Sequence, residues 1–174
     1  NNFAREAFVI SHEYQHYITD QMSGIEYGSG SQVTVGDALH EGYSDYGAAS
    51  YLSDPNAGNG NLGNVTLGLI ITPACYGERR DVGVLKVYQE DSSSSDPHLS
   101  GLSWASALWE LRTEFGMTVV DSLALKSLSF LGSNPGFVTA TESLVKADRA
   151  LFDGIHVNRI RQLMYSEVKF LGAA

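Results

Sequence analysis

Two histidines one helical turn apart stand near the start of the chain. Residues 12–16 read H-E-Y-Q-H, inside a stretch whose apolar residues recur at spacings of three and four. In a helix, positions i and i+4 share one face, so His12 and His16 offer two nitrogen ligands to one metal ion. Glu13 lies about 100° round the helix from His12, where its carboxylate reaches a metal-bound water without binding the metal. This arrangement is what zinc-dependent peptide hydrolysis requires.

A third protein ligand is needed, because catalytic zinc takes three and leaves one position for water. The best candidate is Glu41, which lies in the run H-E-G-Y-S-D at residues 40–45. If its helix packs against the first helix, its carboxylate can point at the metal. Asp45 lies one turn further along the same face. It could accept a hydrogen bond from the second ring nitrogen of a zinc histidine and so fix the tautomer of that ring.

The elements that must position these residues are expected to be helices. Ala38, Gly42, Tyr46 and Ala49 would give the second helix a face of small residues that lets another helix approach closely. Gly, Pro and Asn mark 53–64 as a loop, 65–90 reads as irregular with room for a short helix, and 92–95 reads as an exposed loop. We therefore expect a single, mainly α domain over 1–174, with long irregular loops and helices over 3–22, 35–52, 99–114, 119–131, 137–152 and 155–168.

Composition and charge limit the partners, disulfides and membrane segments that the chain can have. The chain has 174 residues and a net charge of −9, which disfavours nucleic acid and anionic membranes. It has no apolar run of the roughly 18 residues that a transmembrane helix needs. The lone cysteine, Cys75, cannot form an internal disulfide. The excess of carboxylates leaves a calcium site open, although no calcium-loop motif indicates one.

Three motifs together carry a resemblance to a known group. H-E-Y-Q-H followed by E-G-Y-S-D resembles the thermolysin-like zinc metallopeptidases of the gluzincin group. The E-G-Y-S-D form is closer to the fungalysin-like branch and its bacterial relatives than to thermolysin itself. Residues 96–112, D-P-H-L-S-G-L-S-W-A-S-A-L-W-E-L-R, resemble the H-x-x-G-x-x-W-x-x-x-L-W-[DE]-[LI]-R segment of the same group.

The resemblance implies a role for each matching residue. His12, His16 and Glu41 match the ligands of one zinc ion, and Glu13 matches the general base that takes a proton from the attacking water. Asp45 matches the carboxylate that orients a ligand histidine, here His12, and His98 matches the histidine that stabilises the oxyanion. Two further matches are weaker. Tyr27 matches an oxyanion tyrosine, and Arg79 or Arg80 matches an arginine that binds a substrate carbonyl.

Two supporting roles stay open at this point. The carboxylate that orients His98 is either Asp96 or Asp91, and neither has the spacing found in thermolysin. His40 stands where thermolysin has an asparagine that supports a zinc histidine. It is either a supporting donor or a bystander.

The resemblance also implies an architecture and a function. It predicts the helical C-terminal lobe of a secreted zinc endopeptidase that acts on peptides or proteins. The N-terminal β-rich lobe of that architecture is expected to lie outside this chain, in the same precursor or in a second chain. One alternative is a non-hydrolytic, zinc-binding structural or interaction lobe of a larger secreted protein. Another is a purely helical domain without metal.

Overall fold

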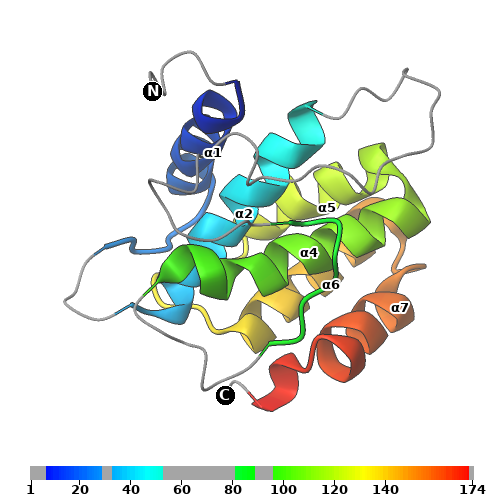
Figure 1. Ribbon diagram of the computed structural model, residues 1–174. Coiled ribbons are helices and arrows are strands. Elements are labelled where there is room, and N and C mark those ends of the chain that lie inside the picture. The colour runs from blue at the N-terminus through cyan, green and yellow to red at the C-terminus, as the bar shows by residue number, and fades with distance from the viewer. Residues whose placement is uncertain (1–6, 29–32, 53–80, 89–95, 173–174) are drawn as a thin grey trace.

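The described part of the chain is mainly α-helical, which confirms the expected fold class (Figure 1). The computed structural model describes residues 7–28, 33–52, 81–88 and 96–172; Cys75, Arg79, Arg80 and the loops expected at 53–64 and 92–95 lie outside these ranges. Apart from an isolated bridge at Asp81, no strand occurs within them. The helical elements are α1 Ala7–Met22, α2 Val35–Leu52, α4 Pro97–Phe115, α5 Met117–Leu128, α6 Phe137–Phe152, α7 Val157–Arg161, a π-helix Gln162–Glu167 and a 3-10 turn Phe170–Gly172. No helix among the described residues is long and apolar enough to cross a membrane.

A reciprocal cap fixes the start of α2. The Thr34 backbone N–H donates to Asp37 Oδ2 at 2.8 Å, and the Asp37 N–H donates to Thr34 Oγ1 at 3.1 Å. The other oxygen of Asp37 accepts from the Gly28 N–H at 2.8 Å. These bonds satisfy amide groups that a helix N-terminus leaves without partners. They also tie the segment after α1 to α2, and so set the register in which α2 presents Glu41.

α2 crosses α4 closely at two glycines. A Cβ atom placed on Gly42 would lie 2.6 Å from the Gly101 carbonyl oxygen, and one placed on Gly101 would lie 2.4 Å from the Ala38 carbonyl oxygen. Side chains larger than hydrogen are therefore excluded from both positions. This small-residue contact matches the close approach expected for α2. It brings the first turn of α4 beside Glu41.

Part of the apolar stripe of α1 lies on its outer face, although Ile18 of the same stripe packs against the core. Ile10 and Tyr14 helped to predict the helix, yet their side chains are 52% and 62% exposed. The inner face, which packs against α2, carries His12 and Thr19, both buried. The helical period was correct, but polar residues occupy the side of α1 that is turned inward.

Two helix boundaries differ from the expected ones because of local backbone geometry. Gly116, at φ +88°, separates α4 from α5 by one residue, where a longer break was expected. The left-handed region favours glycine, so the chain can turn sharply there. α5 ends at Leu128 and not at Leu131, because the Phe130 and Leu131 amides bond three residues back, at 3.0 and 3.1 Å. The expected final helix over 155–168 is divided between α7 and the π-helix.

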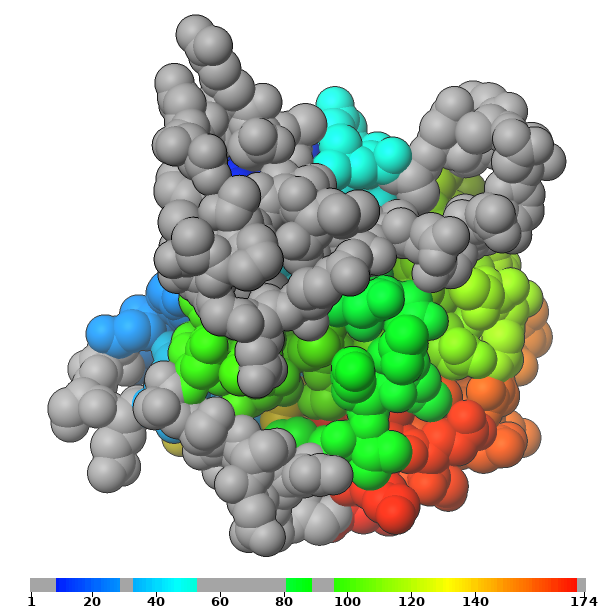
Figure 2. Space-filling view, in the orientation of Figure 1, coloured from blue at the N-terminus to red at the C-terminus, as the bar shows by residue number. Residues whose placement is uncertain are grey.

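α4 is the central helix of the core. Its buried side chains include Trp104, Leu108 and Leu111, and it packs against α2 and α5. Residues 81–88 lie over α4 and reach the C-terminal elements, as Figure 2 shows in bright green beside red. The Lys86 N–H donates to Ser106 Oγ at 3.0 Å, and the Tyr88 N–H donates to the Val168 carbonyl at 2.8 Å. The helix that carries His98 is thus held on several sides.

Candidate metal centre

α1 turns two imidazoles toward α2. The Nε2 atoms of His12 and His16 lie 3.1 Å apart, and the two ring planes are nearly perpendicular, at 81°. His12 is buried, with 5% of its surface exposed, and His16 is partly buried. This is the geometry that the i, i+4 spacing predicts, with both Nε2 atoms directed at one point.

Glu41 on α2 faces both imidazoles. Its Oε2 lies 3.1 Å from His12 Nε2, and its Oε1 lies 3.6 Å from His16 Nε2. A tetrahedral zinc ion with bonds of about 2.0–2.2 Å separates its ligand atoms by about 3.3–3.6 Å. The two Nε2 atoms are 3.1 Å apart, and each has one of the two Glu41 oxygens at 3.1 or 3.6 Å, close to that range. Two imidazoles and one carboxylate are also a donor set that catalytic zinc takes, so these residues fit the ion.

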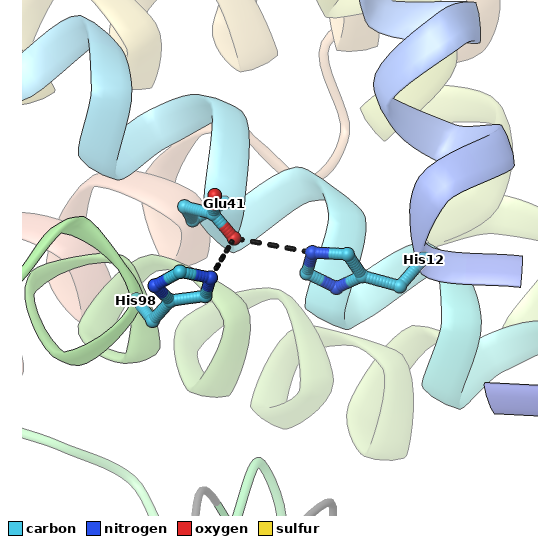
Figure 3. Close-up of side chains that lie close together, drawn as sticks. All are labelled: His12, Glu41 and His98. Carbon is cyan, nitrogen blue, oxygen red and sulfur yellow. Dashed lines mark ion pairs between the residues drawn. The ribbon is translucent and has the colours of Figure 1, made fainter. Parts of the chain in front are cut away.

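His98 from the first turn of α4 joins the same group. Its Nε2 lies 3.2 Å from Glu41 Oε2, and Figure 3 shows it approaching the carboxylate from the side opposite His12. One ligand atom each from His12, Glu41 and His98 lie within 4.8 Å of one another. Three imidazoles therefore surround a single carboxylate. By distance alone, either His16 or His98 could complete a three-ligand set.

Asp96 holds His98. It is the N-cap of α4, and its Oδ1 accepts from the His98 backbone N–H at 2.9 Å. The same oxygen lies 3.0 Å from His98 Nδ1. A carboxylate only accepts hydrogen bonds, so Nδ1 carries the hydrogen and Nε2 faces the site. The structure thus brings Asp96 to His98, while Asp91 lies outside the described residues.

Asp45 lies beneath His12. Its Oδ1 is 2.9 Å from His12 Nδ1, and its side chain is fully buried. Burial lowers the pKa of His12, but the hydrogen bonds and charges of Asp45 and Glu41 together outweigh it and raise the pKa to about 9. Without metal, both ring nitrogens of His12 are therefore protonated at neutral pH, and the ring is positively charged. A metal ion must displace one of these protons.

The pKa values of His16 and Glu41 are both lowered, in contrast to that of His12. Burial lowers the pKa of His16 to about 4, so this imidazole is neutral and ready to bind a metal. Burial alone would raise the pKa of Glu41, but the hydrogen bonds from His12 and Tyr27 and the charge of His98 lower it to about 2. Glu41 is therefore an anion at neutral pH. A neutral imidazole and a carboxylate are the forms that zinc requires.

Tyr27 and Glu13 lie at the edge of the group. The Tyr27 hydroxyl donates to Glu41 Oε1 at 2.5 Å, and burial together with this bond raises the pKa of the phenol. Glu13 is exposed on α1, and its charge also acts on Tyr27. Among the described residues, no hydrogen bond or ion pair holds the Glu13 carboxylate. Arg79 and Arg80, the weaker candidates for substrate binding, lie outside the described ranges.

One supporting pair went partly unnoticed in the sequence. His40 Nδ1 lies 2.5 Å from His16 Nδ1, and His40 Nε2 lies 2.9 Å from Asp20 Oδ1. The sequence motifs leave the role of His40 open and do not indicate Asp20. A signal was present, because His12, His16 and Asp20 follow one another at intervals of four on one helix face.

Comparison with known proteins finds one matching family and one relative. The model of the family "Fungalysin metallopeptidase (M36)" matches residues 2–166. A protein named extracellular metalloproteinase, from Pyrenophora tritici-repentis (strain Pt-1C-BFP), is 25% identical over 185 aligned residues. The alignment covers 89% of this chain and 28% of that relative, so the chain spans much less than the relative's whole length. No solved structure matches the chain significantly.

Proposed function

Because the chain belongs to the fungalysin metallopeptidase family (M36), we propose that it is the zinc-binding helical lobe of an endopeptidase. The observation that carries the proposal is the approach of the Glu41 carboxylate to the paired Nε2 atoms of His12 and His16. Its two oxygens lie 3.1 Å from His12 and 3.6 Å from His16, spacings that suit one tetrahedral zinc ion. In this assignment His98 is not a metal ligand and acts on substrate. Its side chain is 29% exposed, against 6% for His12 and 16% for His16, as befits a group at the open edge of the site.

The ion would supply Lewis acidity, which lowers the pKa of water from 15.7 to about 7 and polarises a carbonyl. Glu13 accepts the proton of the attacking water and later passes it to the leaving amine. An exposed carboxylate beside a zinc histidine suits this task, because it can reach water without binding the metal. Asp45 holds His12 through Nδ1, in the orientation in which Nε2 would face the ion.

His98 would stabilise the oxyanion that forms as water attacks the carbonyl carbon. Since His98 Nδ1 carries a hydrogen and donates it in a hydrogen bond to Asp96, Nε2 can donate only when both ring nitrogens are protonated. The resulting imidazolium offers a charged donor to a developing negative charge. One such donor is worth about 3–4 kcal/mol in comparable sites.

The relative supports a proposal about where the protein acts and on what. That protein is named extracellular, and we propose secretion for this one, with peptides or proteins as substrates. We also propose that a β-rich N-terminal lobe, in the same precursor or in a second chain, covers the other side of the site. The competing function is a zinc-binding lobe that does not hydrolyse peptides.

Two variants test the proposal in the full-length protein. Glu13→Gln should keep bound zinc at the parental level and lose peptide hydrolysis by several orders of magnitude. Glu41→Ala should lose both zinc and activity. A quenched fluorescent peptide measures turnover with and without a zinc chelator. Parent protein that binds zinc but cleaves nothing would support the non-hydrolytic lobe, and Glu13→Gln protein as active as the parent would exclude the mechanism.

A further inference from the structure

A chain of three side chains runs from His16 to the protein surface. The His16 and His40 rings stack with their centroids 4.7 Å apart, and their Nδ1 atoms are 2.5 Å apart. On its other side, His40 Nε2 meets Asp20 Oδ1 at 2.9 Å. His40 is 1% exposed, whereas the Asp20 side chain is 56% exposed. Among the described residues, the hydrogen-bond contacts of the His40 ring are with one metal-site histidine and one surface carboxylate.

The chemistry of the three groups fixes where the hydrogens lie. The Asp20 carboxylate only accepts, so His40 Nε2 carries a hydrogen. In neutral His40, Nδ1 is then an acceptor, and the facing His16 Nδ1 must be the donor. That leaves the lone pair of His16 on Nε2, the atom that faces His12 and Glu41.

The surroundings of His40 allow this assignment. The Tyr27 ring packs against the rings of His16 and His40, at 5.3 and 4.7 Å between centroids. Its hydroxyl donates to Glu41 and so does not compete for either histidine. The contact with His16 is therefore left to His40.

The two helices support one another's ligands in this way. Asp45 of α2 contacts His12 of α1 directly, through a buried carboxylate. His16 of α1 is contacted by His40 of α2, which is in turn held by Asp20 of α1. His16 is thus supported indirectly, by a pair that ends at the exposed Asp20, whereas His12 is supported directly by the buried Asp45.

We propose that His40 and Asp20 form a positioning pair that sets the tautomer of His16, with Nδ1 protonated and Nε2 directed at the metal. This rests on the proposed function only where metal affinity is concerned, since the tautomer is a property of the metal-free protein. His40 and Asp20 are positioning residues and do not touch substrate. Residues that orient a metal ligand typically change metal affinity by about 10–100-fold when they are replaced.

The tautomer can be read directly from the metal-free protein. Long-range proton–nitrogen NMR spectra distinguish a ring nitrogen that carries hydrogen from one that does not. We expect His16 to show a protonated Nδ1 and a bare Nε2, and we expect His40→Leu to shift His16 away from this form. The signals are assigned by their loss in His16→Gln. A protonated Nε2 and a bare Nδ1 in the parent would overturn the proposal.

Zinc affinity provides the second readout, measured by competition with a coloured chelator. His40→Leu should weaken binding by about 10–100-fold. His40→Asn, whose side-chain oxygen lies near the position of Nδ1, should restore most of the loss. Asp20→Ala should lie between the two, and Glu26→Ala, which removes another exposed carboxylate, should bind like the parent.

The outcomes separate this proposal from the proposed function. Equal losses in His40→Asn and His40→Leu would show that His40 only fills space, and no loss in His40→Leu would show no role. If His40→Leu does not fold, His40→Asn and the parental NMR spectrum decide the question. If Glu41→Ala keeps parental zinc affinity, the metal site itself fails, while the tautomer measurement still stands.

Discussion

Gly42 and Gly101 face each other where α2 crosses α4, so closely that a Cβ on Gly42 would lie 2.6 Å from the Gly101 carbonyl oxygen. His98 is three residues before Gly101, and Glu41 is next to Gly42. The same contact that packs the two helices therefore sets the 3.2 Å approach of His98 Nε2 to Glu41. Core packing and site geometry depend on one close backbone contact.

Gly101→Ala is expected to destabilise the fold and displace His98. The added Cβ would meet the Ala38 carbonyl oxygen at 2.4 Å, and rigid backbone cannot give way cheaply. Overpacking of this kind costs about 1–3 kcal/mol or more, measured as the free energy of unfolding in urea. Gly132→Ala is the matched control, because nothing lies within 4 Å of its Cβ position. Equal stability of the two variants would contradict the role of the glycine contact.

A surface ion pair far from the site should contribute to the acid dependence of stability. Arg159 Nε donates to both oxygens of Glu114, at 3.0 and 2.8 Å, and joins the end of α4 to α7. The Arg159 hydrogen bond lowers the pKa of Glu114 below its ordinary 4.5, against a smaller effect of burial. A lowered folded pKa means that the contribution is fully present above about pH 4.5 and is lost as pH falls through the folded pKa.

Glu114→Gln should therefore cost up to about 1 kcal/mol near neutral pH and almost nothing near pH 2. Urea unfolding at both pH values measures the difference. Glu110→Gln, one turn earlier on α4, removes a carboxylate without this partner and should be neutral at both. A Glu114→Gln loss that stays constant with pH would mean that the pair does not act through its charge.

Helical periodicity was enough to predict α1 but does not indicate which of its faces is turned inward. The spacing of Ile10 and Tyr14 correctly indicated a helix over this stretch, yet both side chains point outward. Hydrophobic pattern assigns the apolar side to the core, and here the interior side is needed for His12 and Thr19. The rule fails where functional polar groups must be buried.

Local spacing placed His12 and His16 together, since a helix turn is a fixed distance. Glu41 and His98 are far away in sequence. The need for a third ligand indicated Glu41, whereas only the family motifs indicated that His98 meets these histidines. The contact between His40 and Asp20 could not be predicted from local rules. It depends on how α1 crosses α2, which the backbone packing of both helices sets.

His16 and His98 should differ sharply in what their loss does to zinc. If His16 is the ligand, His16→Ala should weaken zinc binding by more than the roughly 10–100-fold typical of a residue that only orients a ligand. His98→Ala should leave affinity within a few fold and lower turnover by about 100-fold or more, as loss of an oxyanion donor does. Chelator competition and peptide hydrolysis measure the two effects. The reverse pattern would assign His98 to the metal, as its 3.2 Å distance from Glu41 also permits.

Tyr27→Phe distinguishes support of a ligand from action on substrate. In the structure the hydroxyl donates to Glu41 Oε1, so its removal should loosen the carboxylate and weaken zinc binding by about tenfold, the loss expected for one hydrogen bond to a charged group. Tyr17→Phe is the matched control, because that side chain is on the same helix as His16 and 57% exposed. Unchanged zinc affinity with slower turnover in Tyr27→Phe would instead place the hydroxyl on the oxyanion, the role that the family resemblance implies.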